Sequence, residues 1–458
     1  MRVGSILGYG AAIWQVAEAI DIDITSDASI KKAASTAAYG MMKYYTGNNT
    51  GDNPGNLPAP YYWWEAGAMF GIMVDYWYLT GDTTYNTVVQ QGLLSQIGDD
   101  DNYMPQNQTK TEGNDDQAFW GMAAMTAAEE KFMDPPSPQP GWVALAQAVF
   151  NTMVARWDTT TCGGGLRWQI FTFNNGYDYK NSIANGGLFN IGARLARYTG
   201  NSTYADWAEK VFEWEMSVGL ITDDFRVLDG SSDTTNCSTV DQVRYSYNQG
   251  IYLFGAAIMY NHTNGSAVWA NRVSGLLNGT AIFFKDDVMT ESACEDNVST
   301  ANPHGTCDND QLSFKAHLSR WMAATAQLVP STHSTIMSLL KTSAVAAAAQ
   351  CDGGTDGVTC GQHWTANSTW DSTYGVGQQM SAVSVIQNLL IDSAPGLVTN
   401  TTGGTSAGNA AAGTESSSAD GSDLVITPAT GADKAGAGIL TAVVLCGVVA
   451  GIGFMVTG

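Results

Sequence analysis

Six segments of the chain have apolar residues on nearly every side of a predicted helix, and each follows a polar or aromatic loop. Residues 65–74, for example, read Glu-Ala-Gly-Ala-Met-Phe-Gly-Ile-Met-Val. A helix that is apolar on all sides is buried inside a larger structure. We therefore expect six buried helices, which start near Glu65, Asp116, Asn185, Gln249, Lys315 and Gln378.

Between these segments lie stretches in which charged or amide residues recur beside apolar ones at helical spacing. Residues 204–214, Tyr-Ala-Asp-Trp-Ala-Glu-Lys-Val-Phe-Glu-Trp, are an example. This spacing indicates amphipathic helices with one face in water. Six such helices are predicted, at about residues 29–45, 83–97, 142–157, 203–218, 267–277 and 335–350.

The alternation of buried and amphipathic helices predicts a repeated helical hairpin. The buried helices start 51 to 69 residues apart, and an open array of such repeats would expose its end helices. We therefore predict an all-α fold, an (α/α)6 barrel of six inner and six outer helices. Few strands are expected, although residues 165–173 alternate enough for a short hairpin arm. The loops before the inner helices should meet at one end of the barrel, where a site would form.

Asp115 and Asp116 are adjacent carboxylates where a polar loop meets the second buried helix. In a retaining glycosidase one carboxyl group attacks the anomeric carbon and another protonates the leaving oxygen, with the two only about 5 to 5.5 Å apart. The alternative is that either Asp caps the helix, because Asp accepts free N–H groups there and suits the helix dipole. Capping explains one Asp better than two, so the pair is the candidate catalytic centre.

The loops that enter the inner helices are rich in aromatic and amide residues. Aromatic rings match the apolar C–H faces of sugars, and amides and carboxylates match their hydroxyl groups. A single aromatic residue is more often part of the core, so each is a hypothesis. The candidate substrate-binding residues are Trp63, Trp64, Glu65, Asn114, Gln117, Trp168, Tyr177, Lys180, Asn181, Asn185, Tyr247, Asn248 and Gln249.

The net charge of the chain limits the classes of molecule that it could bind. The chain has 458 residues and a formal net charge of −23, so nucleic acid and anionic membrane surfaces are unsuitable electrostatic partners and a neutral glycan is favoured. The five histidines show no HExxH or paired spacing, which disfavours a zinc hydrolase. Residues 99–101 lack the pattern of a calcium loop, and residues 163–165 lack that of a phosphate loop. No metal or cofactor is expected.

Both ends of the chain look like processing signals. Residues 1–19 resemble a secretory signal peptide, and residues 20–391 would form the catalytic domain. Residues 392–436 are rich in Gly, Ser, Thr and Ala and predict a flexible stalk, with attachment of a GPI anchor somewhere in 418–431. Residues 437–458 would be the hydrophobic GPI signal tail; a single transmembrane helix is the alternative. The expected product is a secreted monomer that a GPI anchor holds at the plasma membrane.

Secretion explains the cysteines. Cys446 would leave with the tail, and the remaining six lack metal-binding spacing, so disulfides are predicted. Short separations favour the pairs Cys294–Cys307 and Cys351–Cys360, which leaves Cys162 with Cys237. Sequons for N-glycosylation occur at Asn48, Asn107, Asn201, Asn236, Asn261, Asn264, Asn278, Asn297, Asn367 and Asn400.

The segment around the two aspartates also carries a family resemblance. Residues 103–120, Tyr-Met-Pro-Gln-Asn-Gln-Thr-Lys-Thr-Glu-Gly-Asn-Asp-Asp-Gln-Ala-Phe-Trp, resemble the signature of glycoside hydrolase family 76, in its fungal branch of GPI-anchored wall proteins. Further similar stretches are 24–34, 44–47, 61–70, 162–170 and 180–189. The resemblance runs from about residue 22 to 390, and the stretch 280–307 matches least well.

The resemblance implies an (α/α)6 barrel that acts on α-1,6-linked mannose by a retaining double displacement, with Asp115 as the nucleophile and Asp116 as the general acid/base. In the fungal branch it implies transglycosylation, in which the mannose core of a GPI anchor is cut and the protein-bearing glycan passes to wall β-glucan. Two function classes stay open at this point, a mannosidase or transglycosidase and a non-catalytic glycan-binding wall protein. Other (α/α)6 enzymes, such as uronyl hydrolases or lyases, lack the matched motif.

Overall fold

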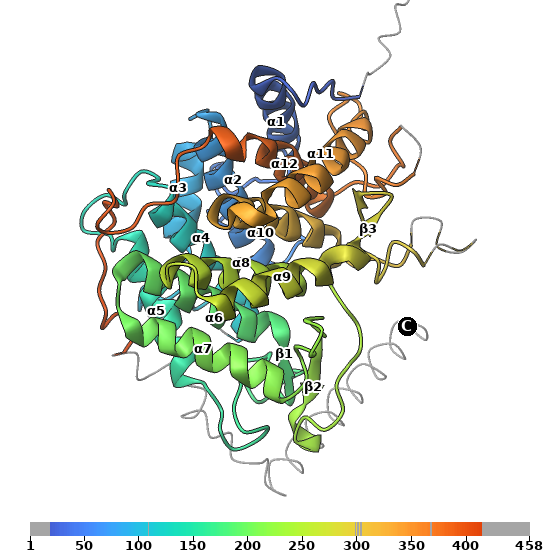
Figure 1. Cartoon of the computed structure of the whole chain (residues 1–458). Helices are drawn as coiled ribbons and strands as arrows, with labels where there is room; N and C mark the ends of the chain where they lie inside the picture. The colour runs from blue at the N-terminus through green and yellow to red at the C-terminus, as the bar shows by residue number, and fades with distance from the viewer. Residues whose placement is uncertain are drawn as a thin grey trace, which may run out of the picture. The chain divides into compact units, whose positions relative to one another are not determined.

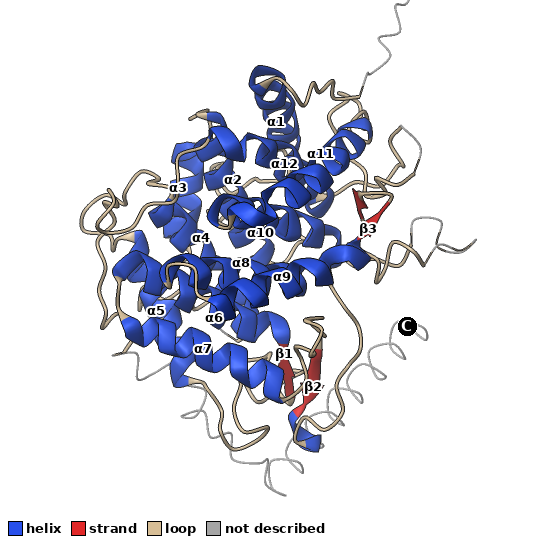
Figure 2. Ribbon diagram, viewed as in Figure 1, coloured by secondary structure: helices blue, strands red, loops and turns tan. Residues whose placement is uncertain are grey.

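The computed structural model describes residues 19–414, apart from Thr109, Val298, Thr300, Ala301, Pro303, His304, Asn367 and Ser368. The predicted signal peptide up to residue 18, the end of the predicted stalk and the GPI tail lie outside the described residues. Figure 1 shows the arrangement of the helices, and Figure 2 shows how little of the chain forms strands.

Six described helices form a closed inner ring. Each contacts the next one in the series, and α12 contacts α2, which closes the ring as predicted for an (α/α)6 barrel. Their first residues lie within three positions of the predicted starts. The inner helices are α2 (Trp63–Thr80), α4 (Asn114–Glu129), α6 (Ser182–Thr199), α8 (Ser246–His262), α10 (Phe314–Leu328) and α12 (Val376–Gln387).

Six further helices cover the outside of this ring, again as predicted. Each packs against one or two inner helices; α1, for example, contacts both α12 and α2. The outer helices are α1 (Asp27–Met42), α3 (Asn86–Ser95), α5 (Trp142–Ala155), α7 (Ser202–Ser217), α9 (Ala267–Gly279) and α11 (His333–Ala349). Short 3-10 helices are η1 (Asp233–Thr235), η2 (Thr280–Phe283), η3 (Gln311–Ser313), η4 (Pro330–Thr332) and η5 (Asn388–Ser393).

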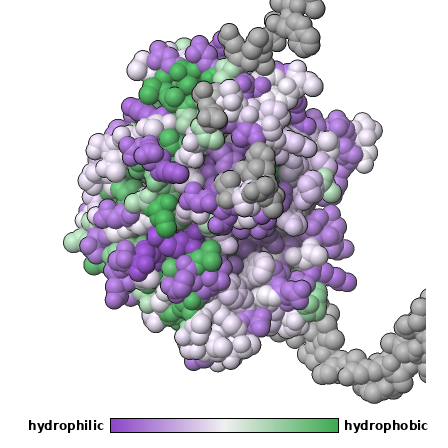
Figure 3. Space-filling view, turned by 90° about the vertical axis from the view of Figure 1, so that its right-hand side faces the viewer, coloured by the Kyte–Doolittle hydropathy of each residue, from purple (hydrophilic) through white to green (hydrophobic). Residues whose placement is uncertain are grey.

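The inner helices pack tightly because their sequences combine large aromatic residues with glycine. A Cβ atom on Gly255 of α8 would lie 2.3 Å from the Phe189 ring of α6, and one on Gly67 of α2 would lie 2.8 Å from the Trp120 ring of α4. A side chain at either glycine would push neighbouring inner helices apart, because protein cores are already close-packed. Every residue of α12 is buried, whereas Asp206, Lys210 and Glu213 of α7 are exposed. Figure 3 shows one face of the molecule, where hydrophobic residues form separate small patches.

The short strands correct one prediction. β1 (Tyr179–Asn181) pairs antiparallel with β2 (Gly230–Ser232), and β3 (Phe284–Lys285) pairs with β4 (Val288–Met289). The predicted hairpin arm at residues 165–173 is wrong. Its backbone bonds outward instead, since the Trp168 carbonyl accepts from the Asn114 N–H at 2.8 Å and the Trp168 N–H donates to Tyr179.

The chain after η5 corrects the predicted start of the stalk at residue 392. The Val398 N–H donates to the Glu129 carbonyl at 2.9 Å, Arg197 donates to the carbonyls of Leu397 and Val398, and the Val143 N–H donates to Ser406 Oγ at 3.0 Å. Residues 394–414 therefore lie along the outside of α4, α5 and α6. Composition alone predicted flexibility, but small residues let this backbone approach the barrel closely enough to form hydrogen bonds.

The three predicted disulfides are present, Cys162–Cys237, Cys294–Cys307 and Cys351–Cys360. Cys162 lies between α5 and α6 and Cys237 between α7 and α8, so that bond joins the loops before the third and fourth inner helices. The nine sequon asparagines that the structure describes are all exposed, and Asn367 lies outside the described residues. Across residues 19–414, excluding the gaps given above, no helix is long and apolar enough to cross a membrane.

Candidate active site

A cleft of about 690 Å³ opens at the end of the barrel where the inner helices begin. Its lining comes from the first turns of α2, α4, α8 and α10, from the loops before them and from the segment before α6. A cavity of about 50 Å³ lies deeper in the barrel, among residues such as Asp75, Glu130 and Arg320. The larger cleft holds the aspartate pair and is the candidate active site.

Asp115 and Asp116 are the second and third residues of α4, and both line the cleft. Asp116 Oδ2 accepts the Gly113 N–H at 2.7 Å, and Asp115 Oδ1 accepts the Asp116 N–H at 3.0 Å. Asp116 therefore also caps the helix, so the capping alternative and the catalytic one apply to the same side chain. Both carboxylates are held by backbone N–H groups at the positive end of α4.

Gly113 fixes how close the two carboxyl groups lie. A Cβ atom on Gly113 would be 2.3 Å from Asp115 Oδ1 and 3.3 Å from Asp116 Oδ2. By the triangle inequality these two oxygens are within about 5.6 Å of each other, which suits a direct displacement with retention. The spacing is below the limit of about 7 Å beyond which a water-mediated inverting reaction would be favoured.

Burial makes the pair hold a proton. Burial, and then the charge of Asp116, raises the pKa of Asp115 well above its ordinary value. Burial, opposed by the Gly113 N–H and assisted by the charge of Asp310, raises the pKa of Asp116 to about 7. Two close carboxylates share one proton near neutral pH because they cannot both ionise cheaply. One protonated and one ionised carboxyl group are therefore available together.

The cleft is acidic. Glu112, Asp229, Asp308 and Asp310 line it together with the catalytic pair, and the lining includes no Lys, Arg or His among the described residues. Burial raises the pKa of Asp310 to about 6, and the Trp64 indole donates to its Oδ1 at 2.9 Å. Asp229 accepts from Tyr179 Oη at 2.9 Å. This charge pattern disfavours an anionic sugar.

Aromatic rings form the walls and floor. Trp63 stacks on Trp120 with ring centroids 5.0 Å apart, and Tyr247 stacks on Phe314 at 3.6 Å. Trp168 is 37% exposed and presents its ring at the cleft. Such flat surfaces match the C–H faces of sugar rings.

The structure brings about half of the predicted site residues into the cleft. Besides the aspartate pair, these are Trp63, Trp64, Trp168, Asn181 and Tyr247. The other predicted residues are absent from the cleft lining: Glu65, Asn114, Gln117, Tyr177, Lys180, Asn185, Asn248 and Gln249.

Four buried amides, which we call the anchoring amides, occupy the fourth position of inner helices and bind backbone. They are Gln117 in α4, Asn185 in α6, Gln249 in α8 and Gln379 in α12. Gln249 Nε2 donates to the carbonyls of Phe225 and Leu276 at 2.9 Å, and its Oε1 accepts the Val227 N–H. Asn185 bonds both backbone groups of Leu166. The prediction that Gln117, Asn185 and Gln249 contact substrate is corrected, because these amides fasten loops and outer segments to the ring.

The other predicted substrate-binding residues that do not line the cleft also contact protein groups. Lys180 is fully buried, lies 2.9 Å from Asp158, and donates to three carbonyl groups of the loop around Cys162. Asn114 binds Arg167 and Arg156, and Tyr177 packs beneath the Arg167 guanidinium. Glu65 accepts from the Tyr62 N–H and from Asn309, and Asn248 donates to Asp229. Glu65 and Asn248 thus support cleft residues from behind.

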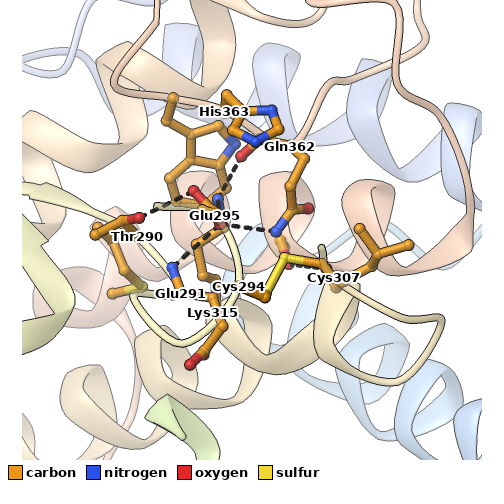
Figure 4. Close-up of polar contacts among 12 residues, drawn as sticks. Thr290, Glu291, Cys294, Glu295, Cys307, Lys315, Gln362 and His363 are labelled. Atoms are coloured by element: carbon orange, nitrogen blue, oxygen red, sulfur yellow. Dashed lines mark hydrogen bonds and ion pairs between the residues drawn. A yellow bond between two sulfur atoms is a disulfide. The ribbon is translucent and has the colours of Figure 1, made fainter. Parts of the chain in front are cut away.

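A buried polar cluster supports the loop that carries Asp308 and Asp310. Figure 4 shows Glu295 at its centre, bonded to Thr290 and Gln362 and paired with Lys315 Nζ at 2.8 Å, beside the Cys294–Cys307 bond. Lys315 is fully buried on α10, and its ammonium group lies 4.0 Å from the Trp364 ring centre.

Sequence reasoning missed several residues that line the cleft. Asp308 and Asp310 precede α10, and their place before a predicted inner helix was a usable signal. Glu112, Gln108 and Gln169 stand in or near matched motifs without a distinguishing pattern. Asp229 lies in a loop between an outer and an inner helix, and no local pattern marks it.

Comparison with known proteins now decides the family. The family model Glycosyl hydrolase family 76 matches residues 29–401. The chain belongs to this family. It is therefore a glycoside hydrolase, as the resemblance of residues 103–120 predicted.

Two curated fungal relatives are similar over almost their whole length. Mannan endo-1,6-alpha-mannosidase DCW1 of Saccharomyces cerevisiae is 49% identical over 454 residues, which cover 98% of each chain. Mannan endo-1,6-alpha-mannosidase DFG5 of the same yeast is 47% identical, covering 95% of this chain and 93% of its own.

Two solved structures share the fold. Dfg5 from Chaetomium thermophilum, in complex with glucosamine, matches with a TM-score of 0.82 and 46% identity, covering 86% of this chain and 98% of that one. An inactive variant of the Salegentibacter α-1,6-mannanase, with two aspartates changed to asparagine and α-1,6-mannotriose bound, matches with a TM-score of 0.62 over 79% of this chain and 99% of that one. At 15% identity this second likeness concerns the fold alone.

Proposed function

We propose that this protein is a retaining endo-α-1,6-mannosidase and transglycosidase of the fungal cell wall. The observation that carries the proposal is the half-buried Asp115–Asp116 pair, which shares a proton in a cleft lined by aromatic residues. The named activity of the DCW1 and DFG5 relatives supports α-1,6-linked mannan as the substrate.

In this mechanism Asp115 attacks the anomeric carbon while Asp116 gives its proton to the leaving oxygen. Burial favours a proton on Asp115, whereas attack on the anomeric carbon requires Asp115 to be ionised. The positive charge that develops on the sugar ring reverses this preference, because it stabilises the ionised carboxylate beside it. Asp116 then takes a proton from the incoming water or sugar hydroxyl, which releases the covalent intermediate.

We further propose that the natural donor is the mannose core of a GPI anchor and that wall β-glucan is the acceptor. A GPI core carries an amino sugar, and glucosamine is the ligand bound to the Chaetomium Dfg5. The six lining carboxyl groups, of which only some are ionised, and the lack of a lining cation among the described residues favour a neutral or cationic glycan over an anionic one. We also propose that the protein lies at the cell surface as a secreted, GPI-anchored monomer, on the basis of the signal-like sequences of residues 1–19 and 437–458.

Product analysis with an α-1,6-mannoside donor, with and without a β-glucan acceptor, tests the proposal. We expect mannoside cleavage with retained anomeric configuration, and a larger transfer product when the acceptor is present. The Asp115→Asn and Asp116→Asn variants should be inactive and still folded. Cleavage without transfer would support the mannosidase activity and contradict transglycosylation. Binding without cleavage by the wild-type protein would favour the non-catalytic glycan-binding alternative.

A further inference from the structure

Glu112 is a buried carboxyl group at the edge of the cleft that the mechanism above does not use. Its side chain is 1% exposed, yet it belongs to the cleft lining. Neither of its carboxyl oxygens has a hydrogen-bond partner among the described residues. A buried polar group left in this state destabilises the fold, because it has lost its hydrogen bonds to water.

The surroundings of Glu112 keep it neutral. Burial, and then the negative charge of Asp116, raises its pKa well above the ordinary value. Arg156 acts in the opposite direction, but its guanidinium donates to Asn114 Oδ1 at 2.8 Å and to Gln117. Glu112 therefore carries a proton near neutral pH and offers both an O–H donor and a carbonyl acceptor.

The position of Glu112 indicates which of the two sugars at the scissile bond it would contact. It precedes Gly113, whose N–H binds Asp116 at 2.7 Å, and Asp116 is the charge that acts on it. Because the acid/base faces the leaving oxygen, a group beside Asp116 meets the leaving sugar and, after it departs, the incoming acceptor.

We propose that Glu112 is a substrate-contacting residue whose neutral carboxyl group hydrogen-bonds a hydroxyl of the sugar on the Asp116 side of the scissile bond. This inference rests on the proposed function. A sugar hydroxyl would supply the hydrogen-bond partner that the Glu112 carboxyl group lacks within the protein. This explains why a buried carboxyl group without a partner stands in the wall of the cleft.

Two variants test the inference. Glu112→Leu keeps a similar volume and removes both polar atoms, whereas Glu112→Gln keeps an N–H donor and a carbonyl acceptor. Each is made in the full chain with Asp115→Asn to prevent turnover, and binding of α-1,6-mannotriose is measured by calorimetry together with thermal unfolding without sugar. We expect Glu112→Leu to bind about 10-fold more weakly or worse, the loss of one hydrogen bond to a buried group. Its unfolding temperature should be unchanged or higher, and Glu112→Gln should restore binding.

The outcomes separate the two proposals. If the parent Asp115→Asn protein fails to bind mannotriose, the mannan assignment fails. If the parent binds and Glu112→Leu binds equally well, the role of Glu112 is refuted while the proposed function stands. A lower unfolding temperature of Glu112→Leu that Glu112→Gln repairs, with binding unchanged in both, would assign Glu112 a structural role instead.

Discussion

At the scale of single residues, the catalytic pair depends on a position without a side chain. Gly113 has φ −90° and ψ 165°, a conformation open to any residue, so backbone strain does not require glycine there. The lack of space does require glycine, because an added Cβ atom would lie 2.3 Å from Asp115 Oδ1 and 3.1 Å from the Trp168 carbonyl. The glycine lets the backbone N–H and both carboxylates share one small volume.

The Gly113→Ala variant should therefore lose activity while it stays folded. The methyl group displaces the Asp115 carboxylate, and a misplacement of about 1 Å costs about 100-fold in rate. The measurement is kcat/KM on an α-1,6-mannoside, with circular dichroism melting as the check on folding. Gly396→Ala is the matched control, since nothing lies within 4 Å of its Cβ position. A fully active Gly113→Ala enzyme would contradict this view of the site.

The dependence of rate on pH follows from the shared proton. The active form of the pair holds one proton, and the doubly protonated pair loses its first proton at the pKa of Asp116, which is raised to about 7. We expect kcat/KM to rise as pH rises through about 7, because one of the two carboxyl groups must be ionised to attack. Asp310→Asn removes a negative charge that raises this pKa, so its acidic limb should move to lower pH, whereas Asp206→Asn on the exposed face of α7 should leave the limb in place. An unmoved limb in Asp310→Asn would exclude that coupling.

At the scale of elements, the anchoring amides of four inner helices hold loops and outer segments against the ring. Each of the four helices that carries one presents its first residues toward the cleft end and its fourth residue toward a neighbouring segment. Asp115 and Tyr247, at second positions, line the cleft, while Gln117 and Gln249, two residues later in the same helices, bind backbone. Successive residues of a helix are rotated by about 100° about its axis, so side chains two positions apart point in different directions.

Gln249→Leu should destabilise the fold rather than weaken substrate contacts directly. It leaves the Val227 N–H and the carbonyls of Phe225 and Leu276 without partners in a buried place. We expect a loss of about 2 to 4 kcal/mol in the free energy of unfolding, measured with urea. Gln91→Leu, an exposed amide on α3, should change it by less than about 0.5 kcal/mol. Equal stability of the two variants would show that the anchoring contacts contribute little.

At the scale of the whole molecule, several carboxyl groups are buried and neutral, and they make stability depend on pH. Burial raises the pKa of Glu215 from about 4.5 to about 8, although the Ser182 hydroxyl donates to its carboxyl group at 3.2 Å. Burial likewise raises the pKa of Glu65 and Glu291 to about 8. Between the unfolded and folded pKa values the folded state binds more protons than the unfolded chain, so stability falls as pH rises.

The unfolding temperature should therefore decrease between pH 5 and pH 8. In the Glu215→Gln variant the decrease should be smaller, because an amide in that place has no proton to lose. Glu213→Gln, on the exposed face of the same helix, should show the wild-type slope. Differential scanning calorimetry across this range gives the comparison, and a wild-type slope in Glu215→Gln would show that its proton is not part of the effect.

The sequence alone determined the number, order and approximate bounds of the inner and outer helices, because the period of apolar residues records which faces are buried. It also located Asp115 and Asp116, whose adjacency is a local property, and the cysteine pairs that close short loops. The family signature of residues 103–120 is equally local.

Only the tertiary structure decided which helix-entry residues reach the cleft. Trp168 and Asn185 stood in the same candidate list, but one ring faces the cleft and the other side chain binds Leu166. Asp229, Asp308 and Asp310 join Asp115 in one cleft although they are distant in sequence. Closure of the ring brings those loops together, and the backbone hydrogen bonds of residues 394–414 likewise depend on the packed surface beneath them. Local patterns carry no record of such long-range placement.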